Sequence, residues 1–241
     1  MFRRSFTMTA LIALITGAPA SATVTTPVFH RSAFSGNPQV TNPYFPLSVG
    51  TVLYYEGHRE GVPSSDRFEV TRKRKTIAGV RTTVVHDQFF LGGKLHENTL
   101  DWYAQDKAGN AWYFGEQTEE FKPNGEVDNR DGSWRAGRRA GRKAPVARPG
   151  IFMPARPEVG TGFKQEIAPP VSEDEFEALD LNASITTPYV TTNRSLATKE
   201  FSAQEPGILD NKYYVLGIGT AIELTAVGPE DTLKLVNVER R

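Results

Sequence analysis

A histidine between two carboxylates is the arrangement in this sequence best suited to acid–base chemistry. If the flanking segments pair as an antiparallel hairpin, His86 lies opposite Thr99, and the carboxylates of Glu97 and Asp101 lie on its two diagonals. A histidine held in this way can act as a general base or as a metal ligand. The alternative is a solvent-facing ladder of opposite charges, in which nearby lysines take part.

Motifs for metals, cofactors and activated nucleophiles are missing from the sequence. The four histidines include no pair at i, i+2 or i, i+4 spacing, so no zinc site is expected. The segment DNRDGS (128–133) is similar to a calcium loop, but its glycine would place Val127 at the first ligand and Arg138 at the bidentate acid. We therefore expect no metal and no cofactor. A hydrolase of an envelope polymer that uses His86, Glu97 and Asp101 remains an alternative.

A run of positive charge forms the second candidate site. Between residues 135 and 148 no acidic residue interrupts the basic ones, which are Arg135, Arg138, Arg139, Arg142, Lys143 and Arg148. Such a run can bind an anionic envelope polymer or a phosphate-bearing ligand. Nucleic acid is not expected as a partner, because no aromatic residue lies between the charges to stack on bases. The alternatives are a solvated loop, or an internal ion pair with the acidic segment 173–177. The anion-binding candidates are Arg138, Arg139, Arg142 and Lys143.

Apolar side chains in a long glycine- and proline-rich segment, 122–162, form the third candidate site. Trp134, Phe152 and Met153 could line or cap an apolar pocket, with Tyr103 and Tyr113 as further ligand-binding candidates. The alternative is that they simply close the hydrophobic core.

The elements that must position these residues are β-strands. Short runs rich in Val, Thr, Tyr, Phe and Trp alternate with glycine-containing turns, which is typical of an antiparallel β protein. The expected strands are 51–57, 66–77, 80–91, 94–106, 110–121, 162–168, 176–190, 194–204, 211–227 and 231–239. The first five should form a meander, because two-residue loops at 78–79 and 92–93 suit primed turns. We expect an all-β fold, with a large antiparallel meander curled into a barrel or half-barrel and the segment 122–162 as one long loop.

Tight loops also predict the register of the strands. The loop at 92–93 places Thr83 opposite Trp102, and the loop at 107–109 places Ala104 opposite Trp112. One face then collects the expected core, namely Phe68, Val70, Val85, Phe89, Leu100, Trp102, Trp112 and Phe114. The other face should be polar and should carry Lys73, Lys75, His86, Glu97, Thr99, Asp101, Tyr103 and Tyr113.

Residues 1–22 have the pattern of a secretory signal peptide. Arg3 and Arg4 precede an apolar run over 10–15 and small residues at 20–22. The two arginines also fit a twin-arginine signal, but we favour the general export route. We expect a linker over 23–45, a single β domain over 46–241, no transmembrane segment, and a periplasmic or secreted location. The absence of cysteine means that the hydrophobic core, rather than disulfides, must stabilise the fold.

Four sequence motifs resemble those of a group of exported bacterial β-rich proteins of unknown function. They are NPYFPLSVGTVLYYEG (42–57), ENTLDWYAQDKAGNAWYFGE (97–116), DGSW (131–134) and KYYVLGIG (212–219). The resemblance implies an envelope or secreted β protein and transfers no catalytic residue. The sequence as a whole favours non-catalytic binding of an apolar or amphipathic ligand, with the hydrolase and a structural or adhesion module as alternatives.

Overall fold

The computed structural model describes residues 23–240, which are almost entirely β-strand. One sheet contains 16 strands, and β2 and β3 pair separately. The part of the chain described also contains one short 3-10 helix, η1 (Arg31–Ala33). The strands are β1 (Thr23–Thr25), β2 (Val40–Asn42), β3 (Phe45–Leu47), β4 (Thr51–Arg59), β5 (Val62–Ile77), β6 (Val80–Leu91), β7 (Lys94–Gln105), β8 (Ala111–Phe121), β9 (Val127–Asn129), β10 (Trp134–Arg135), β11 (Arg148–Met153), β12 (Thr161–Lys164), β13 (Glu166–Ile167), β14 (Asp174–Thr186), β15 (Thr191–Ser202), β16 (Leu209–Val215), β17 (Gly219–Val227) and β18 (Asp231–Arg240).

The central meander, β4 to β8, confirms the expected strands and turns. Ala78 and Gly79 have φ angles of 47° and 79°, and Gly92 and Gly93 have φ angles of 57° and 76°. Two consecutive positive φ angles define the primed turn that matches the twist of a hairpin. The chain therefore folds back after two residues at both places.

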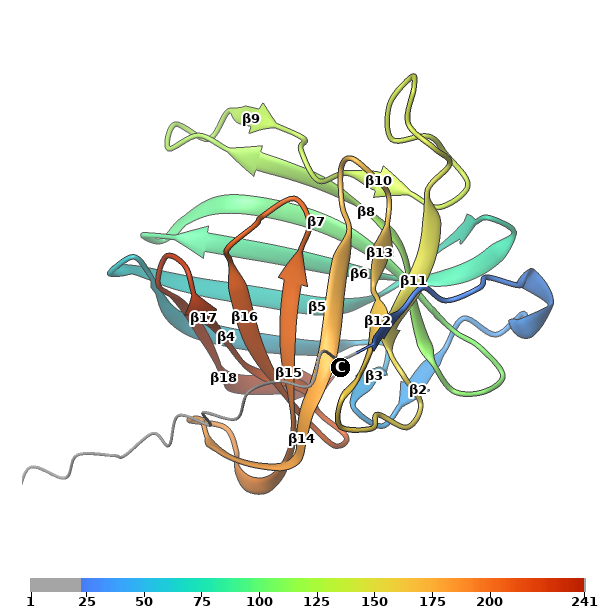
Figure 1. Cartoon of the computed structure of the whole chain (residues 1–241). Helices are drawn as coiled ribbons and strands as arrows, with labels where there is room; N and C mark the ends of the chain where they lie inside the picture. The colour runs from blue at the N-terminus through green and yellow to red at the C-terminus, as the bar shows by residue number, and fades with distance from the viewer. Residues whose placement is uncertain (1–22, 241) are drawn as a thin grey trace, which may run out of the picture.

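The sheet curls into a half-barrel, as predicted. Its strand order is β1-β12-β14-β15-β16-β17-β18-β4-β5-β6-β7-β8-β11-β13, so the pairing of β18 with β4 joins the C-terminal strands to the meander. Figure 1 shows β14, β15 and β16 crossing in front of the meander strands. β12, next to the first strand of the order, and β13, its last strand, are joined by one residue of chain. The backbone N–H of that residue, Gln165, donates to the Asp174 carbonyl at 2.7 Å. The concave face of the sheet thus encloses an interior.

The predicted register between β6 and β7 holds at the turn and is wrong beyond it. Leu91 pairs with Lys94 as expected, but a bulge at His96 shifts the pairing by one residue. Thr83 therefore lies opposite Tyr103 rather than Trp102. Because side chains alternate between the faces of a strand, a shift of one residue exchanges the faces.

The predicted division into a core face and a polar face is consequently wrong. Tyr103 and Tyr113 are buried on the concave side, and the register places Phe68, Val70, Val85 and Phe89 on that side with them. Trp102, Trp112 and Phe114 share the convex side, where the Lys75 ammonium lies 3.6 Å from the Trp102 ring centroid. Both faces are buried here, because the sheet curls around one of them and the N-terminal segment covers the other.

The segment that we expected to be a linker provides this cover. Phe29 and Phe34 pack on Trp112 and Phe114 with ring centroids 5.5 to 6.3 Å apart. Residues 23–45 also include β1, which pairs in parallel with β12, and the buried residues Val40, Asn42 and Phe45. They are part of the packed structure rather than a free linker.

Two further expectations about the chain are corrected. The segment 122–162 is not a structureless loop, because it contains β9, β10 and β11, which pair with β8. The expected strand 211–227 is a hairpin, β16 and β17, with a turn at Leu216, Gly217 and Ile218. The expected signal peptide lies outside the described residues. Residues 23–240 contain no helix that is both long and apolar enough to cross a membrane.

A close approach between β8 and β10 leads to a testable prediction. Gly115 has φ of 116°, and a Cβ atom added there would lie 2.4 Å from the Trp134 carbonyl oxygen. We expect Gly115→Ala to lower the free energy of unfolding by about 2 kcal/mol more than Gly125→Ala, which shares a positive φ but has no atom within 4 Å of its added Cβ. If urea unfolding gave equal losses of unfolding free energy for the two variants, the close approach of β10 to β8 at Gly115 would be contradicted.

Candidate functional site

A cavity of about 190 Å³ lies inside the half-barrel. Its lining comes from both halves of the sheet and from β3, β11 and the β12–β14 connection. The lining includes Phe45, Leu53, Tyr55, Asp66, Phe68, Asp87, Tyr103, Tyr113, Phe152, Gln165, Glu166, Asp174, Glu200, Lys212, Ile218, Thr220, Glu223 and Leu233. The interior is therefore partly aromatic and partly acidic.

The aromatic part of the wall is a continuous group of rings. The Phe152 ring lies 4.4 Å from Phe45 and 5.3 Å from Tyr103, measured between centroids. Tyr103 stacks on Tyr113 at 4.8 Å, as their pairing across β7 and β8 requires. These rings come from separate elements, so the fold as a whole fixes their positions.

The acidic part of the wall is dominated by carboxyl groups. Six of them line the cavity together with a single ammonium group, that of Lys212. They are Asp66, Asp87, Glu166, Asp174, Glu200 and Glu223. Burial disfavours a charged carboxylate, and each of these groups needs a proton, a donor or a cation. The structure meets this need differently in different places.

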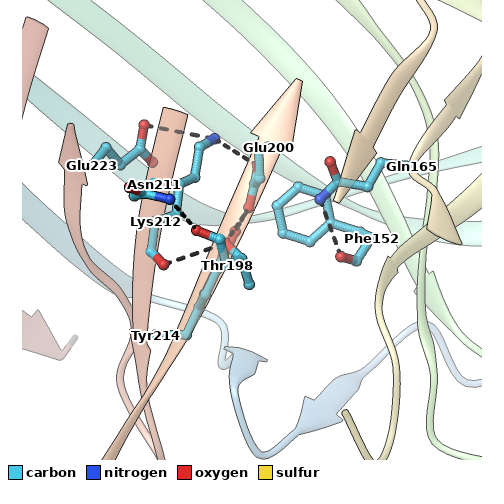
Figure 2. Close-up of polar contacts among 8 residues, drawn as sticks. All are labelled: Phe152, Gln165, Thr198, Glu200, Asn211, Lys212, Tyr214 and Glu223. Carbon is cyan, nitrogen blue, oxygen red and sulfur yellow. Dashed lines mark hydrogen bonds and ion pairs between the residues drawn. The ribbon is translucent and has the colours of Figure 1, made fainter. Parts of the chain in front are cut away.

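The Lys212 ion-pair cluster holds two of the carboxylates (Figure 2). Lys212 Nζ lies 3.3 Å from Glu200 Oε2 and 3.6 Å from Glu223 Oε2. Tyr214 and Thr198 donate hydroxyl hydrogen bonds to the other Glu200 oxygen, at 2.7 and 3.0 Å. Burial alone would lower the Lys212 pKa, but the two glutamates raise it well above its usual value. The two glutamates therefore favour the ammonium form of Lys212.

Lys212 also stands where the cavity meets the outside. A crevice of about 170 Å³ shares Lys212, Glu223 and Leu233 with the cavity, and Arg59 and Asp231 line its outer part. Arg59 Nε and Asp231 Oδ2 form an ion pair at 2.6 Å. The crevice therefore carries both positive and negative side chains next to the cavity.

A second group of acids is held by ring donors. The Tyr113 hydroxyl lies 2.5 Å from Asp101 Oδ1 and 3.1 Å from Glu116 Oε2. Because this hydroxyl has one proton, one of the two contacts requires a protonated carboxyl group. Burial, followed by the neighbouring charge of other acids, raises the pKa values of both Asp101 and Glu116 well above their usual values. Glu166 accepts from Trp134 Nε1 at 3.0 Å and from the Ser172 hydroxyl.

Asp66 and Asp87 form a pair without such donors. They lie on β5 and β6, diagonal to one another, with Asp66 opposite Phe89 and Asp87 opposite Phe68. Their carboxyl groups are in hydrogen-bond contact with each other. Burial is the main reason that the Asp66 pKa rises to about 7 and the Asp87 pKa rises well above its usual value. The Oδ1 atom of each is buried and has no other partner.

The acid–base group predicted from the sequence is not assembled. His86 pairs with Leu100 rather than Thr99, which puts it on the convex side with Asn98, whose Oδ1 lies 2.7 Å from His86 Nε2. Asp101 is on the concave side, and the pairing of Glu97 with Phe89 places it there too. The bulge at His96 separates the histidine from both carboxylates, so we do not propose a hydrolase based on them.

The predicted ligand-binding residues divide into two groups. Phe152, Tyr103 and Tyr113 line the cavity, whereas Trp134 and Met153 do not. Trp134 packs edge-on against Tyr113, with ring centroids 5.7 Å apart, and Met153 is fully buried in the core. Trp134 thus supports the cavity wall from behind.

The basic run stays on the surface. Arg138, Arg139, Arg142 and Lys143 are exposed, and the part of the chain described places no acidic group in an ion pair with them. The acidic segment 173–177 pairs instead with Lys164 and Lys199. The internal pairing is therefore wrong, and anion binding by these residues stays a prediction.

The acidic wall was not among the sites predicted from the sequence. One face of β5 carries an acid next to apolar side chains, namely Asp66 next to Phe68 and Val70, and this mixture was available as a signal. It was hidden because charged residues in a strand usually mark the solvated side. Within residues 23–240 no three His, Cys, Asp or Glu side chains are arranged to hold a metal ion.

No protein-family model and no curated protein matches this chain. Among solved structures, a Bacteroides fragilis protein that has a YmcC-like fold and is inferred to be exported aligns with 82% of this chain and 99% of its own. The alignment has a TM-score of 0.42 and 10% sequence identity. At that level of similarity it supports no conclusion about function.

Proposed function

We propose that this chain is an exported protein that binds a small amphipathic molecule in the cavity of the half-barrel. The observation that carries the proposal is the cavity itself, a space of about 190 Å³ with rings on one side and acids on the other. The export signal expected in residues 1–22 would bring the site outside the cytoplasm.

The size of the cavity sets the class of ligand. An apolar cavity of about 150 Å³ is large enough to bind benzene. A space of about 190 Å³ can therefore hold one ring and a short polar head group. Larger lipids would need the fold to open.

The lining matches an amphipathic molecule better than a purely apolar one. Binding pockets usually combine apolar walls with a few convergent polar groups that orient the ligand. Here Phe45, Phe68 and Phe152 supply apolar surface, while Asp66 and Asp87 supply polar atoms without partners among side-chain donors. A hydrocarbon would leave these oxygens buried and unpaired, which is costly.

Benzyl alcohol is a suitable probe of the proposed function. We expect saturable binding with a dissociation constant on the order of 1 mM, the affinity that a molecule of this size reaches. An NMR titration of the backbone amides measures it. Ile218→Trp, which puts an indole into the cavity wall, should abolish binding.

Leu216→Trp is the matched control for this titration. Leu216 lies in the same turn, is 50% exposed, and does not line the cavity. The proposal fails if wild-type protein shows no saturable shifts, or if both tryptophan variants bind benzyl alcohol as well as the wild type does.

A further inference from the structure

We propose that the Asp66–Asp87 pair is the recognition point for an ammonium group, so that the ligand is a small primary amine with an aromatic or similarly compact apolar body. This inference rests on the proposed function, because it concerns the head group of the ligand in the same cavity.

The position of the pair suits an ammonium ion. Asp66 lies opposite Phe89, and Asp87 lies opposite Phe68, across β5 and β6. Acids and rings therefore alternate on one surface. Tyr55 lies opposite Asp66 on β4 and adds another ring. Carboxylates and ring faces together are the groups that attract an organic cation most strongly once it leaves water.

Within the acidic wall, the Asp66–Asp87 pair is the part whose carboxyl oxygens lack hydrogen-bond donors or a cation. Glu200 and Glu223 have Lys212 as their cation, and Glu166 has the Trp134 and Ser172 donors. Asp66 and Asp87 have contact only with each other, and each retains a buried Oδ1 atom without another partner. One proton shared between them satisfies a single bond, whereas an ammonium group offers three donors.

The Ser64 hydroxyl is a further buried polar group without a hydrogen-bond partner near the pair. Ser64 lies two residues before Asp66 on β5, on the same side of the strand, and its buried Oγ has no partner. Three polar atoms without partners therefore occupy neighbouring positions of the concave face. A donor-rich head group satisfies the two Asp oxygens that line the cavity, and a carboxylate or phosphate does not.

The surrounding charges favour the same choice. Glu97, Asp101 and Glu223 act on the pair from β7 and β17, and all three are acidic. Lys212, on β16, is the cation that lines the cavity, and its ion pairs are with Glu200 and Glu223. The groups that surround the pair are therefore mainly acids, and each of them that ionises favours a bound cation over a bound anion.

A matched pair of ligands tests the inference. Benzylamine and benzyl alcohol have the same body, and they differ in whether the head group is an ammonium or a hydroxyl at neutral pH. We expect wild-type protein to bind benzylamine at least about tenfold more tightly than benzyl alcohol, since charge-assisted hydrogen bonds are stronger than neutral ones. Isothermal titration calorimetry and NMR titration both measure the ratio.

The Asp66→Asn/Asp87→Asn double variant should lose the preference, while a backbone amide NMR spectrum like that of the wild type shows that the fold around its cavity is intact. Glu69→Gln removes one negative charge from the convex side of β5 and should keep the preference. Equal affinity of the wild type for both ligands, or a preference that survives in the double variant, would overturn the inference while leaving the cavity proposal in place. If neither ligand binds the wild type, the proposed function fails and this inference with it.

Discussion

The double substitution Asp66→Asn/Asp87→Asn is expected to stabilise the protein at pH 8. In the native structure the Asp66 pKa rises from 3.8 to about 7, mainly because the group is buried. A rise of that size corresponds to on the order of 4 kcal/mol of cost once the carboxyl group must ionise. Because the pair borders a cavity that water can enter, we expect a smaller gain of about 2 kcal/mol in the double variant.

Because the Asp66 pKa is raised in the folded protein, the gain in stability of the double variant depends on pH. A carboxyl group whose folded-state pKa is raised binds more protons in the folded state than in the unfolded state, so stability falls as pH rises from about 4 to about 7. The gain in the variant should therefore be absent near pH 4 and should increase toward pH 8. Thermal unfolding at the two pH values measures it, with an expected rise in Tm of roughly 4–8 °C at pH 8.

Glu69→Gln is the control for this experiment, because it removes a carboxylate from the same strand on the other side of the sheet. It should show no comparable gain at pH 8. A double variant that is less stable than the wild type at pH 8 would mean that the acid pair contributes to the fold rather than opposing it. A gain would fit the general finding that binding groups are kept at a cost in stability.

Lys212→Met is expected to destabilise the protein strongly at pH 8. The substitution leaves Glu200 and Glu223 facing each other without their cation, and removing one partner of a buried ion pair costs about 3–5 kcal/mol. We expect roughly 2–3 kcal/mol here, because the side chains of Lys212 and Glu223 remain 24% and 39% exposed. The Tm should fall by roughly 4–12 °C.

This loss should depend on pH, whereas a simple loss of packing would not. Without Lys212, the two glutamates should hold protons to a higher pH in the folded state, so the variant loses less stability at pH 5 than at pH 8. Adding Glu200→Gln and Glu223→Gln should restore much of the stability, since an amide oxygen in place of the Glu200 carboxylate can still accept from the Tyr214 hydroxyl. Lys234→Met, at an exposed lysine of β18, should change little. A loss in Lys212→Met that is equal at both pH values would contradict the electrostatic explanation.

The strands and turns of the meander could be predicted from the sequence because they depend on local chemistry. Residue pairs such as Ala78-Gly79 and Gly92-Gly93 adopt positive φ angles, and they set both the place and the type of the turn. The half-barrel was also predictable, since a large antiparallel sheet must curl to protect its edges. These features need no knowledge of distant contacts.

The faces of the sheet could not be predicted, because one extra residue decides them. The bulge at His96 has no clear sequence signal, yet it moves Tyr103 and Asp101 to the concave face, while His86 stays on the outer face where it was expected. The predicted histidine site failed for this reason alone. The cover on Trp112 and Phe114 was equally hidden, because Phe29 and Phe34 lie in a proline-containing segment far away in the chain.

The acidic wall depends on contacts between distant strands. Asp66 and Asp87 belong to the meander, whereas Lys212 and Glu223 come from the C-terminal strands. Each of these residues appears on its own strand as an ordinary charged position. Only the pairing of β18 with β4 brings the two groups around one cavity.

The most direct test of the cavity site is to locate a bound ligand by intermolecular nuclear Overhauser effects. With benzyl alcohol near saturation, its ring protons should show effects to the methyl groups of Leu53 and Leu233, which are buried and line the cavity. Effects confined to exposed methyl groups, such as those of Leu216 and Val227, would contradict the assignment of the cavity as the ligand site.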